Sequence, residues 1–427
     1  MKKIIILISI FSILFNVTPL YAESLNFENA RSYILIDSKS GQVLYGHNID
    51  QKLYPASVTK IMTAIIALEK GDLNTMMTAS ESAVYDIGDG GMNIGIMPGE
   101  ELRMEDLLNA MLIISANETA NILAENISPT RKDFIDLMNK KAVELGALNT
   151  NFVTTCGAHD PNHYSTASDF AKIARYAMQI PKFREIVRKS SYQMSPTNKH
   201  SKWDPLYSTN KLLGQSSEFF TDVIGIKTGY TSQAGNNLAS AANYSDGTEL
   251  ISVVFGVFGP NAKNDVISYS KQLLEYGFRN YSLQTIANPN QVIKSVDVVN
   301  SSTASKLDLV TAEEFKCVLP KDASLRKITE HVDISSNIKA PISKGQVLGF
   351  IEYRNDNVSL GKVDLVASAA VDEKAPSVTA ETAKAISSSP LKKVILTLLF
   401  ILAAFIILRI ILRRISRNLR AKGQRDR

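Results

Sequence analysis

Cysteine, tryptophan and histidine are scarce in this chain of 427 residues, which contains 2 cysteines, 1 tryptophan and 5 histidines. Two cysteines, Cys156 and Cys317, cannot build a disulfide framework or a cysteine-based zinc site. We place them in different domains and therefore expect no disulfide between them. The histidines form no His-Glu-x-x-His pattern, so the sequence lacks the local signature of a zinc hydrolase.

The chain also has little excess charge. It contains 47 Lys and Arg against 42 Asp and Glu, a formal net charge of +5. Much of this excess lies in the last segment, 413–427, which is basic. A charge excess gathered at one end is not the footprint of a nucleic-acid-binding surface, so we expect no nucleic acid partner.

Long apolar runs occur near the two ends of the chain. Lys2 and Lys3 precede an apolar stretch that closes on the small residue Ala22, which predicts a signal peptide over 1–22. Near the other end, 391–412 is long and apolar enough to cross about 30 Å of hydrocarbon, which predicts a transmembrane helix. The alternative is a buried core helix, which is disfavoured because no folded sequence follows it.

The basic residues predict the orientation of this helix. The tail 413–427 carries more Lys and Arg than the segment before the helix, and the positive side stays in the cytoplasm. We therefore expect a single-pass protein of the cell membrane, anchored at its C-terminus. Everything between the two apolar segments is expected to be extracytoplasmic.

The exported part is long enough for one large and one small domain. In the first, 23–285, short strands are predicted at 33–37, 42–45, 223–227, 237–242 and 250–258. Helices are predicted at 57–70, 104–114, 118–126, 131–145, 166–178 and 265–276, the last ended by Gly277. This order predicts an α/β (α+β) domain with a sheet made from both ends and helices between. The second, 286–370, reads as a small all-β domain, and 371–390 as a flexible linker.

A serine and a lysine share one face of the first predicted helix. Ser57 and Lys60 are three residues apart, and Pro55 suits a helix start. If Lys60 is desolvated, its neutral amine can deprotonate Ser57. The alternative is an N-cap serine with a solvated lysine. The apolar face that follows indicates a buried helix and favours the catalytic interpretation.

A second motif, Ser115-Ala116-Asn117, follows the helix 104–114. In an extended or turn segment, residues two apart point to the same side. The Ser115 hydroxyl can relay a proton to a leaving amine, and the Asn117 amide can hold Lys60 and a substrate carbonyl. Taken alone, a helix-ending serine with an N-cap asparagine explains it equally simply.

The third motif, Lys227-Thr228-Gly229, ends an apolar run. Lys227 and Thr228 offer a permanent cation and a hydroxyl at a strand edge, and Gly229 lets backbone and substrate approach closely. The backbone N–H of Tyr230 can join that of Ser57 as an oxyanion hole. The alternative is an ordinary strand-to-turn transition.

In this order, the three motifs resemble those of the penicillin-recognising serine enzymes. The wider context narrows the resemblance to the low-molecular-mass penicillin-binding proteins, the D-alanyl-D-alanine carboxypeptidases. It extends almost continuously over 33–278 and includes the segments 54–64, 107–117, 163–169, 225–235 and 273–278. The resemblance implies a transpeptidase/β-lactamase-like fold, with an antiparallel sheet and a helical subdomain. A small all-β domain and a C-terminal membrane anchor complete this family pattern.

The resemblance also implies roles. Ser57 would be the acylated nucleophile, Lys60 the general base, and Ser115 and Asn117 the relay and orienting groups. The substrate-binding residues would be Lys227, Thr228, Gly229 and Tyr230, with the first two on the terminal carboxylate. The implied reaction removes the terminal D-alanine from peptidoglycan stem pentapeptides, with β-lactam antibiotics as inhibitors and no metal or organic cofactor.

Two segments depart from the family pattern. The family usually has an arginine after the strand that matches 251–258, whereas 259–266 has none and Lys263 is the nearest cation. A lysine cannot supply a planar, two-pronged contact. In the middle loop, Thr154-Thr155-Cys156-Gly157 replaces the family's Asn-Pro before glycine, which predicts a changed loop geometry.

Three other functions share part of this pattern. A class A-like β-lactamase needs a glutamate in a Glu-x-x-Leu-Asn pattern, and 144–149 is one residue too long and predicted helical. An inactive wall-binding scaffold is disfavoured because all motif residues are intact. A D,D-endopeptidase acting on crosslinked stem peptides differs only in substrate shape and stays open.

Overall fold

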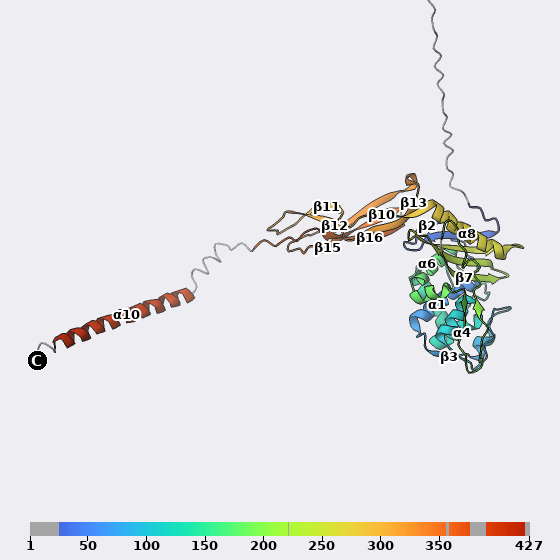
Figure 1. Cartoon of the computed structure of the whole chain (residues 1–427), viewed down its shortest axis with the longest axis horizontal. Coiled ribbons are helices and arrows are strands. Elements are labelled where there is room, and N and C mark those ends of the chain that lie inside the picture. Colours follow the sequence, from blue (N-terminus) through green and yellow to red (C-terminus); the bar gives the residue numbers. More distant parts are fainter. Residues whose placement is uncertain (1–24, 221, 356–357, 376–389, 423–427) are drawn as a thin grey trace, which may run out of the picture. The chain divides into compact units, whose positions relative to one another are not determined.

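The computed structural model describes residues 25–220, 222–355, 358–375 and 390–422 (Figure 1). The predicted signal peptide, most of the predicted linker and the end of the basic tail lie outside the described residues. The chain divides into two compact units. The first comprises Met1–Gln291, Thr311–Ile334 and Gly349–Leu365, and the second Val292–Val310, Ser335–Leu348 and Val366–Arg427.

A five-stranded antiparallel sheet organises the first unit. Its strand order is β2-β1-β9-β8-β7. The strands are β1 (Ala30–Asp37), β2 (Val43–His47), β7 (Asp222–Thr231), β8 (Gly235–Asn243) and β9 (Glu249–Val257). The N-terminal hairpin β1-β2 pairs through β1 with β9, with Ser32 opposite Phe255. The predicted fold class, with a sheet made from both ends of the domain, is confirmed.

The two faces of this sheet pack against different helices. Along β9, Ile251, Val253 and Phe255 join the core cluster that includes α1 (Lys60–Lys70) and α6 (Ala167–Met178). Their neighbours Leu250 and Val254 join the cluster that includes α8 (Ala262–Asn280). Successive strand residues point to opposite faces, so this alternation places helices on both sides. It explains why β9 is mostly apolar, with Glu249 and Ser252 as its polar residues.

The remaining elements of this region form the helical subdomain. Its helices are α2 (Glu81–Tyr85), α3 (Met104–Ile113), α4 (Asn117–Ile127), α5 (Arg131–Glu144) and α7 (Pro181–Val187). Two small strand pairs were not predicted: β3 (Met76–Thr78) with β4 (Glu101–Arg103), and β5 (Ser191–Tyr192) with β6 (Leu206–Tyr207). Thr130 and Thr166 are the N-cap residues of α5 and α6. The side chain of each accepts a hydrogen bond from the backbone N–H three residues later in the chain.

The predicted end of the last helix at Gly277 is wrong. Helix α8 continues to Asn280, and Gly277 lies inside it. A Cβ at this position would come within 2.4 Å of Leu250 Cδ1 and 2.7 Å of Leu35 Cδ2. Glycine is therefore required here so that α8 can approach the sheet closely, and not because the helix ends.

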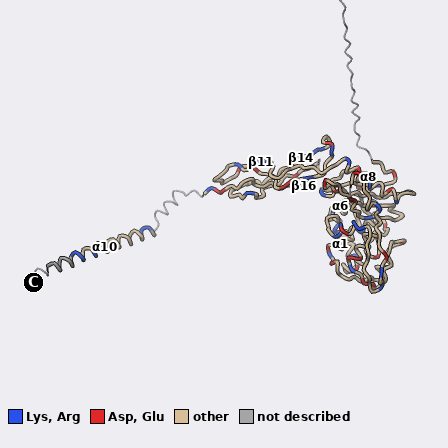
Figure 2. The backbone as a smooth tube through the Cα atoms, viewed as in Figure 1, with Lys and Arg blue, Asp and Glu red and all other residues tan. Residues whose placement is uncertain are grey.

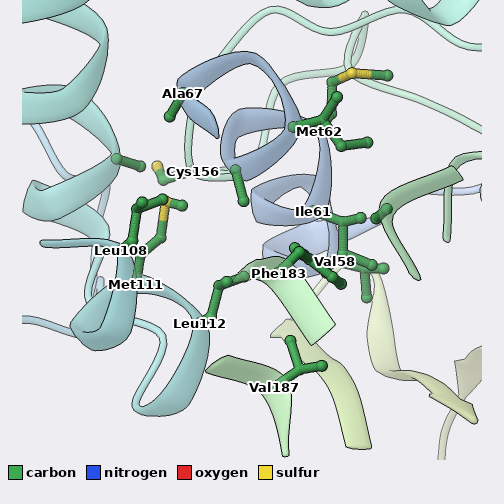
Figure 3. Close-up of a cluster of buried hydrophobic side chains, with 14 of the residues drawn as sticks. Val58, Ile61, Met62, Ala67, Leu108, Met111, Leu112, Cys156, Phe183 and Val187 are labelled. Carbon is green, nitrogen blue, oxygen red and sulfur yellow. The ribbon is translucent and has the colours of Figure 1, made fainter. Parts of the chain in front are cut away.

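The helix that carries Lys60 runs through the middle of the larger core. Figure 3 shows Val58 and Ile61 packed beside side chains from the neighbouring helices, with Met62 on the opposite side of α1. The partners labelled there are Leu108, Met111, Leu112, Phe183 and Val187. Burying this apolar face fixes the helix, and with it the position of the lysine.

The C-terminal region is built from strands. Five of them form a sheet in the order β11-β12-β16-β15-β14, and β10 pairs with β13. These strands are β10 (Tyr281–Ala287), β11 (Val292–Asp297), β12 (Lys306–Thr311), β13 (Phe315–Pro320), β14 (Ile328–Ile334), β15 (Val347–Asn355) and β16 (Val358–Ala367). The described residues from 281 to 375 contain one short 3-10 helix, Ala323–Leu325, and no α-helix. The predicted all-β region is confirmed.

The predicted linker starts later than expected. Val371 pairs with Ile342, and Glu373 with Ser301, as isolated β-bridges. Beyond the undescribed part, α10 (Pro390–Lys422) contains a stretch, Lys392–Ser416, that is long and apolar enough to span a membrane. Figure 2 shows basic residues near both ends of this helix. Its existence confirms the predicted apolar C-terminal helix.

Candidate active site

The first motif begins on a single 3-10 turn, Ala56–Thr59, directly before α1. Ser57 lies on this turn and is half-buried, whereas Lys60, the first residue of α1, is fully buried. The Lys60 Nζ lies 2.8 Å from Ser57 Oγ. Ala56 has φ +49°, a left-handed conformation that costs a non-glycine residue energy. The predicted helix over 57–70 is thus 3-10 in its first turn.

Lys60 is surrounded by three acceptors. Its Nζ donates to Ser57 Oγ, to Asn117 Oδ1 at 2.6 Å and to the Cys156 carbonyl at 2.8 Å. Three acceptors satisfy the three N–H groups of an ammonium. Burial nevertheless lowers the pKa of Lys60 to about 8, with Cys156 and Glu118 acting in the opposite direction. Such a group exchanges its proton near neutral pH, as a general base must.

The second motif lies at the junction of α3 and α4. Ser115 adopts φ +73°, and this left-handed turn lets Asn117 start α4 beside Lys60. Asn117 Nδ2 donates to the Ile87 carbonyl at 2.9 Å, which orients its Oδ1 toward the lysine. Both Ser115 and Asn117 are buried. The structure thus brings Asn117 to Lys60, whereas no hydrogen bond within the described residues joins the Ser115 side chain to the first motif.

The third motif lies inside β7 and not at a strand-to-turn transition, since β7 continues to Thr231. This strand is at the edge of the sheet. A Cβ on Gly229 would come within 2.9 Å of the Pro55 carbonyl oxygen and 3.1 Å of Ser57 N. The glycine therefore allows β7 to lie against the nucleophile turn. Tyr230, next along the strand, is exposed.

The permanent charge expected for Lys227 does not fit its surroundings. Its side chain is 1% exposed, and its Nζ donates to the Thr228 carbonyl at 3.0 Å. Burial, and secondly the charge of Lys60, lower the pKa of Lys227 well below its usual range. An anion bound beside Lys227 would act in the opposite direction and favour its charged form.

The loop that departs from the family pattern contributes directly to the site. It supplies the Cys156 carbonyl that accepts from Lys60. Gly157 has φ +83°, and a Cβ there would meet the Ala56 carbonyl oxygen at 1.9 Å. The loop therefore lies directly against the strained turn before Ser57, and only glycine fits at that contact.

His163 holds this loop and was not predicted as a site residue. Its Nδ1 accepts from the backbone N–H groups of Val153 and Thr154 at 3.1 and 3.2 Å. The proton must then be on Nε2, which lies 2.8 Å from Thr59 Oγ1 and donates to it. Burial lowers the pKa of His163 to about 4, so the ring is neutral at physiological pH.

The segment after β9, where the family usually has an arginine, has other side chains around it. Phe258 follows β9, and the Arg31 guanidinium lies over its ring at 4.6 Å. Lys263 lies at the start of α8 and is exposed. Within the described residues, no hydrogen bond or ion pair joins Lys263 to the three motifs. Thr209 instead reaches the third motif, with its Oγ1 2.7 Å from Thr228 Oγ1.

Comparison with known proteins agrees with this geometry. Residues 21–259 match the family Peptidase_S11, described as D-alanyl-D-alanine carboxypeptidase, and residues 281–373 match the C-terminal domain of penicillin-binding protein 5. D-alanyl-D-alanine carboxypeptidase DacF of Bacillus subtilis (strain 168) is 31% identical over 341 residues, which are 79% of this chain and 85% of the relative. DacC of Escherichia coli (strain K12) is 30% identical over 357 residues, 81% and 85% of the two chains.

Solved structures agree as well. The structure of penicillin binding protein 5 from Haemophilus influenzae superposes with a TM-score of 0.66 at 30% identity, over 82% of this chain and 99% of that one. A variant of the Streptomyces K15 DD-transpeptidase superposes with a TM-score of 0.55 at 28% identity, over 60% of this chain and 100% of that one. These matches favour the carboxypeptidase interpretation over the β-lactamase and scaffold alternatives. The chain belongs to the S11 peptidase family of D-alanyl-D-alanine carboxypeptidases.

Proposed function

We propose that this protein removes the terminal D-alanine from peptidoglycan stem pentapeptides through an acyl-enzyme on Ser57. The observation that carries the proposal is the position of the Lys60 Nζ. It lies within hydrogen-bond distance of both Ser57 Oγ and Asn117 Oδ1, in a buried site that lowers its pKa to about 8. A serine and a base in this arrangement perform acyl transfer.

In the first step, the neutral amine of Lys60 takes the proton of Ser57, and Ser57 Oγ attacks the carbonyl between the two D-alanines. The oxyanion that forms is held by the backbone N–H groups of Ser57 and Tyr230, where Gly229 brings β7 against the nucleophile turn. Collapse breaks the C–N bond. Ser115 passes the proton from Lys60 to the departing D-alanine amine.

In the second step, water attacks the ester on Ser57. Lys60, neutral again after the first step, takes a proton from this water. The new tetrahedral centre collapses, the bond to Ser57 Oγ breaks and the proton returns to the serine. A tetrapeptide leaves, and the site is restored.

Lys227 and Thr228 bind the substrate's terminal carboxylate. An anion placed beside Lys227 stabilises its ammonium form, so substrate binding and protonation of this buried lysine favour each other. β-Lactam antibiotics carry a carboxylate and a reactive carbonyl at corresponding places, and they acylate the same Ser57. The acyl group then blocks the site.

We further propose the cellular placement. Residues 1–22 direct export, 23–285 form the catalytic domain and 286–370 the all-β domain. The segment 371–390, after its β-bridges at Val371 and Glu373, is the linker between them and the membrane. The helix over 391–412 spans the membrane, with the basic segment 413–427 in the cytoplasm. The apolar stretch of α10 and the larger number of Lys and Arg in the sequence 413–427 support this topology.

The function is tested with the full-length protein in detergent micelles. After incubation with benzylpenicillin, intact mass and peptide mapping should place one adduct on Ser57. The protein should also release D-alanine from a synthetic stem pentapeptide, and Ser57→Ala should abolish both reactions. Ser268→Ala is a matched control, because Ser268 also precedes a lysine, Lys271, by three residues on a helix but is exposed.

An adduct on another serine, or an unchanged rate for Ser57→Ala, would remove the proposal. A crosslinked muropeptide dimer, assayed beside the pentapeptide, distinguishes carboxypeptidase from endopeptidase. Faster cleavage of the dimer would favour the endopeptidase alternative.

A further inference from the structure

Thr209 connects two of the three motifs, although no motif contains it. It follows β6, and its backbone N–H donates to the carbonyl of Ile113, the last residue of α3, at 3.1 Å. Its side-chain Oγ1 lies 2.7 Å from Thr228 Oγ1 on β7. One residue thus reaches both the helix end that leads into Ser115 and the strand that carries Lys227.

The backbone around Thr209 is held independently of its hydroxyl. The next residue, Asn210, is buried; its Nδ2 donates to Ser240 Oγ at 3.3 Å, and its Oδ1 accepts from Leu212 N at 3.0 Å. Together with the bond to Ile113, these contacts fix the position of residue 209. None of these contacts involves the Thr209 hydroxyl, so a substitution that removes only the hydroxyl should leave the fold intact.

The hydrogen bond between the two threonine hydroxyls uses only one of their two protons. Each hydroxyl can donate one hydrogen bond and accept two. Whichever oxygen donates across the 2.7 Å separation, one O–H remains for a further acceptor. Thr209 and Thr228 are both half-buried, so the pair is partly open to solvent or to a ligand.

Lys227 precedes Thr228 on β7. Its Nζ donates to the Thr228 carbonyl at 3.0 Å, so the amine and the Thr228 hydroxyl belong to consecutive residues of this strand. Without Thr209, the Thr228 hydroxyl would rotate among its staggered positions, and binding an anion would first have to immobilise it. With Thr209 present, the Thr228 hydroxyl is already held in one orientation.

We propose that Thr209 is a positioning residue for the substrate's terminal carboxylate, acting by fixing the Thr228 hydroxyl. The proposal rests on the proposed function, in which Lys227 and Thr228 bind that carboxylate. Thr209 does not take part in the chemistry at Ser57. It therefore influences how tightly substrate binds and not how fast the bound substrate reacts.

The experiment measures D-alanine release from diacetyl-L-lysyl-D-alanyl-D-alanine by the full-length protein in detergent micelles. Thr209→Val keeps the volume and removes the hydroxyl. It should raise KM about fivefold to tenfold and leave kcat within about twofold, since one hydrogen bond to an anion site is lost. Thr209→Ser, which keeps a hydroxyl, should restore KM. Thr285→Val, on an exposed position of β10, is the control for a threonine remote from the site.

A double-mutant cycle tests whether Thr209 acts through Thr228. The variant with both Thr209→Val and Thr228→Val should have the KM of Thr228→Val alone, because the partner is already absent. A general packing defect would instead add to the effect of Thr228→Val. Additive effects, an unchanged KM in Thr209→Val, or a fall confined to kcat would each overturn the proposal.

Two checks keep these outcomes separate. The fraction of each variant that binds benzylpenicillin at saturation counts folded sites, and kinetic constants are expressed per folded site. If Thr209→Val does not accumulate, Thr209→Ala replaces it with the same expected rise in KM. Failure of the wild-type protein to release D-alanine would reject the proposed function, whereas an active wild type with an unaffected Thr209→Val would reject this inference alone.

Discussion

The rate of Ser57 acylation should depend on pH through the protonation of Lys60. Only the neutral amine can accept the serine proton, so the rate should rise with pH until Lys60 is fully deprotonated and then level off. Burial is the largest influence on this lysine and lowers its pKa to about 8, because an ammonium is costly to keep away from water. The rising limb of the plot of acylation rate against pH should therefore be centred near pH 8.

The size of the effect follows from the shift. The pKa of Lys60 falls from 10.5 to about 8, which is 2.5 units. At pH 7, a lysine with the ordinary pKa is neutral in roughly 1 molecule in 3000, and Lys60 in roughly 1 in 10. Burial of Lys60 thus increases the reactive form about 300-fold near neutral pH.

The assay is the second-order rate constant for acylation by benzylpenicillin, measured from about pH 6 to about pH 9.5 at constant ionic strength. The constant should rise about tenfold per pH unit below the limb. Cys156 and Glu118 raise the pKa of Lys60, and the charge of Lys60 in turn lowers the pKa of Lys227. Since Glu118 raises the pKa of Lys60, Glu118→Gln should move the limb to lower pH. A rate independent of pH over this range, or a limb near the ordinary lysine pKa, would refute the reasoning.

Three further predictions concern other parts of the site. Lys60→Arg should abolish acylation, because a guanidinium keeps its proton, whereas Lys227→Arg should retain measurable acylation with weaker binding; equal acylation constants would contradict this division of roles. Gly229→Ala should slow acylation roughly 100-fold, since its Cβ would meet backbone atoms at about 3 Å and displace β7 from Ser57. His163 has a folded pKa of about 4 against 6.5 for the ordinary imidazole, so acid should destabilise the fold progressively as pH falls from 6.5 through 4. In thermal melts across this pH range, the free energy of unfolding of His163→Gln should fall by up to about 3 kcal/mol less than that of the wild type. Equal falls in the two proteins would exclude His163 as the cause.

Much of the site could be predicted because its side chains come from short local patterns. Ser57 and Lys60 are three residues apart on an apolar helix, and this spacing alone puts them on one face. The left-handed turn at Ser115 was not predicted, because a positive φ in a non-glycine residue leaves no mark in the sequence. The burial of Lys227 was also missed, since it depends on how closely the nucleophile turn and β7 approach.

Other parts of the site could not be found from local patterns. The Cys156 carbonyl is a backbone group, which any residue would supply, and only the fold brings it to Lys60. His163 was part of a matching segment, but its contact with Thr59 joins residues 104 positions apart. Gly277 was misread as a helix end because glycine also serves close packing, and sequence alone does not separate the two uses.

The pairing of β1 with β9 has a consequence for the order in which the protein folds. Ser32 and Phe255 are opposite each other but 223 positions apart along the chain. Contacts of such long range are slow to form, because a large loop must close before they contribute stability. A chain that crosses a membrane from its N-terminus would have β1 outside well before β9 arrives to pair with it. The contact between Gly229 and the turn at Ser57 joins the same two ends of the domain. With the export proposed above, new chains should gain the capacity to bind penicillin late, and the appearance of a covalent penicillin label would time the completion of folding.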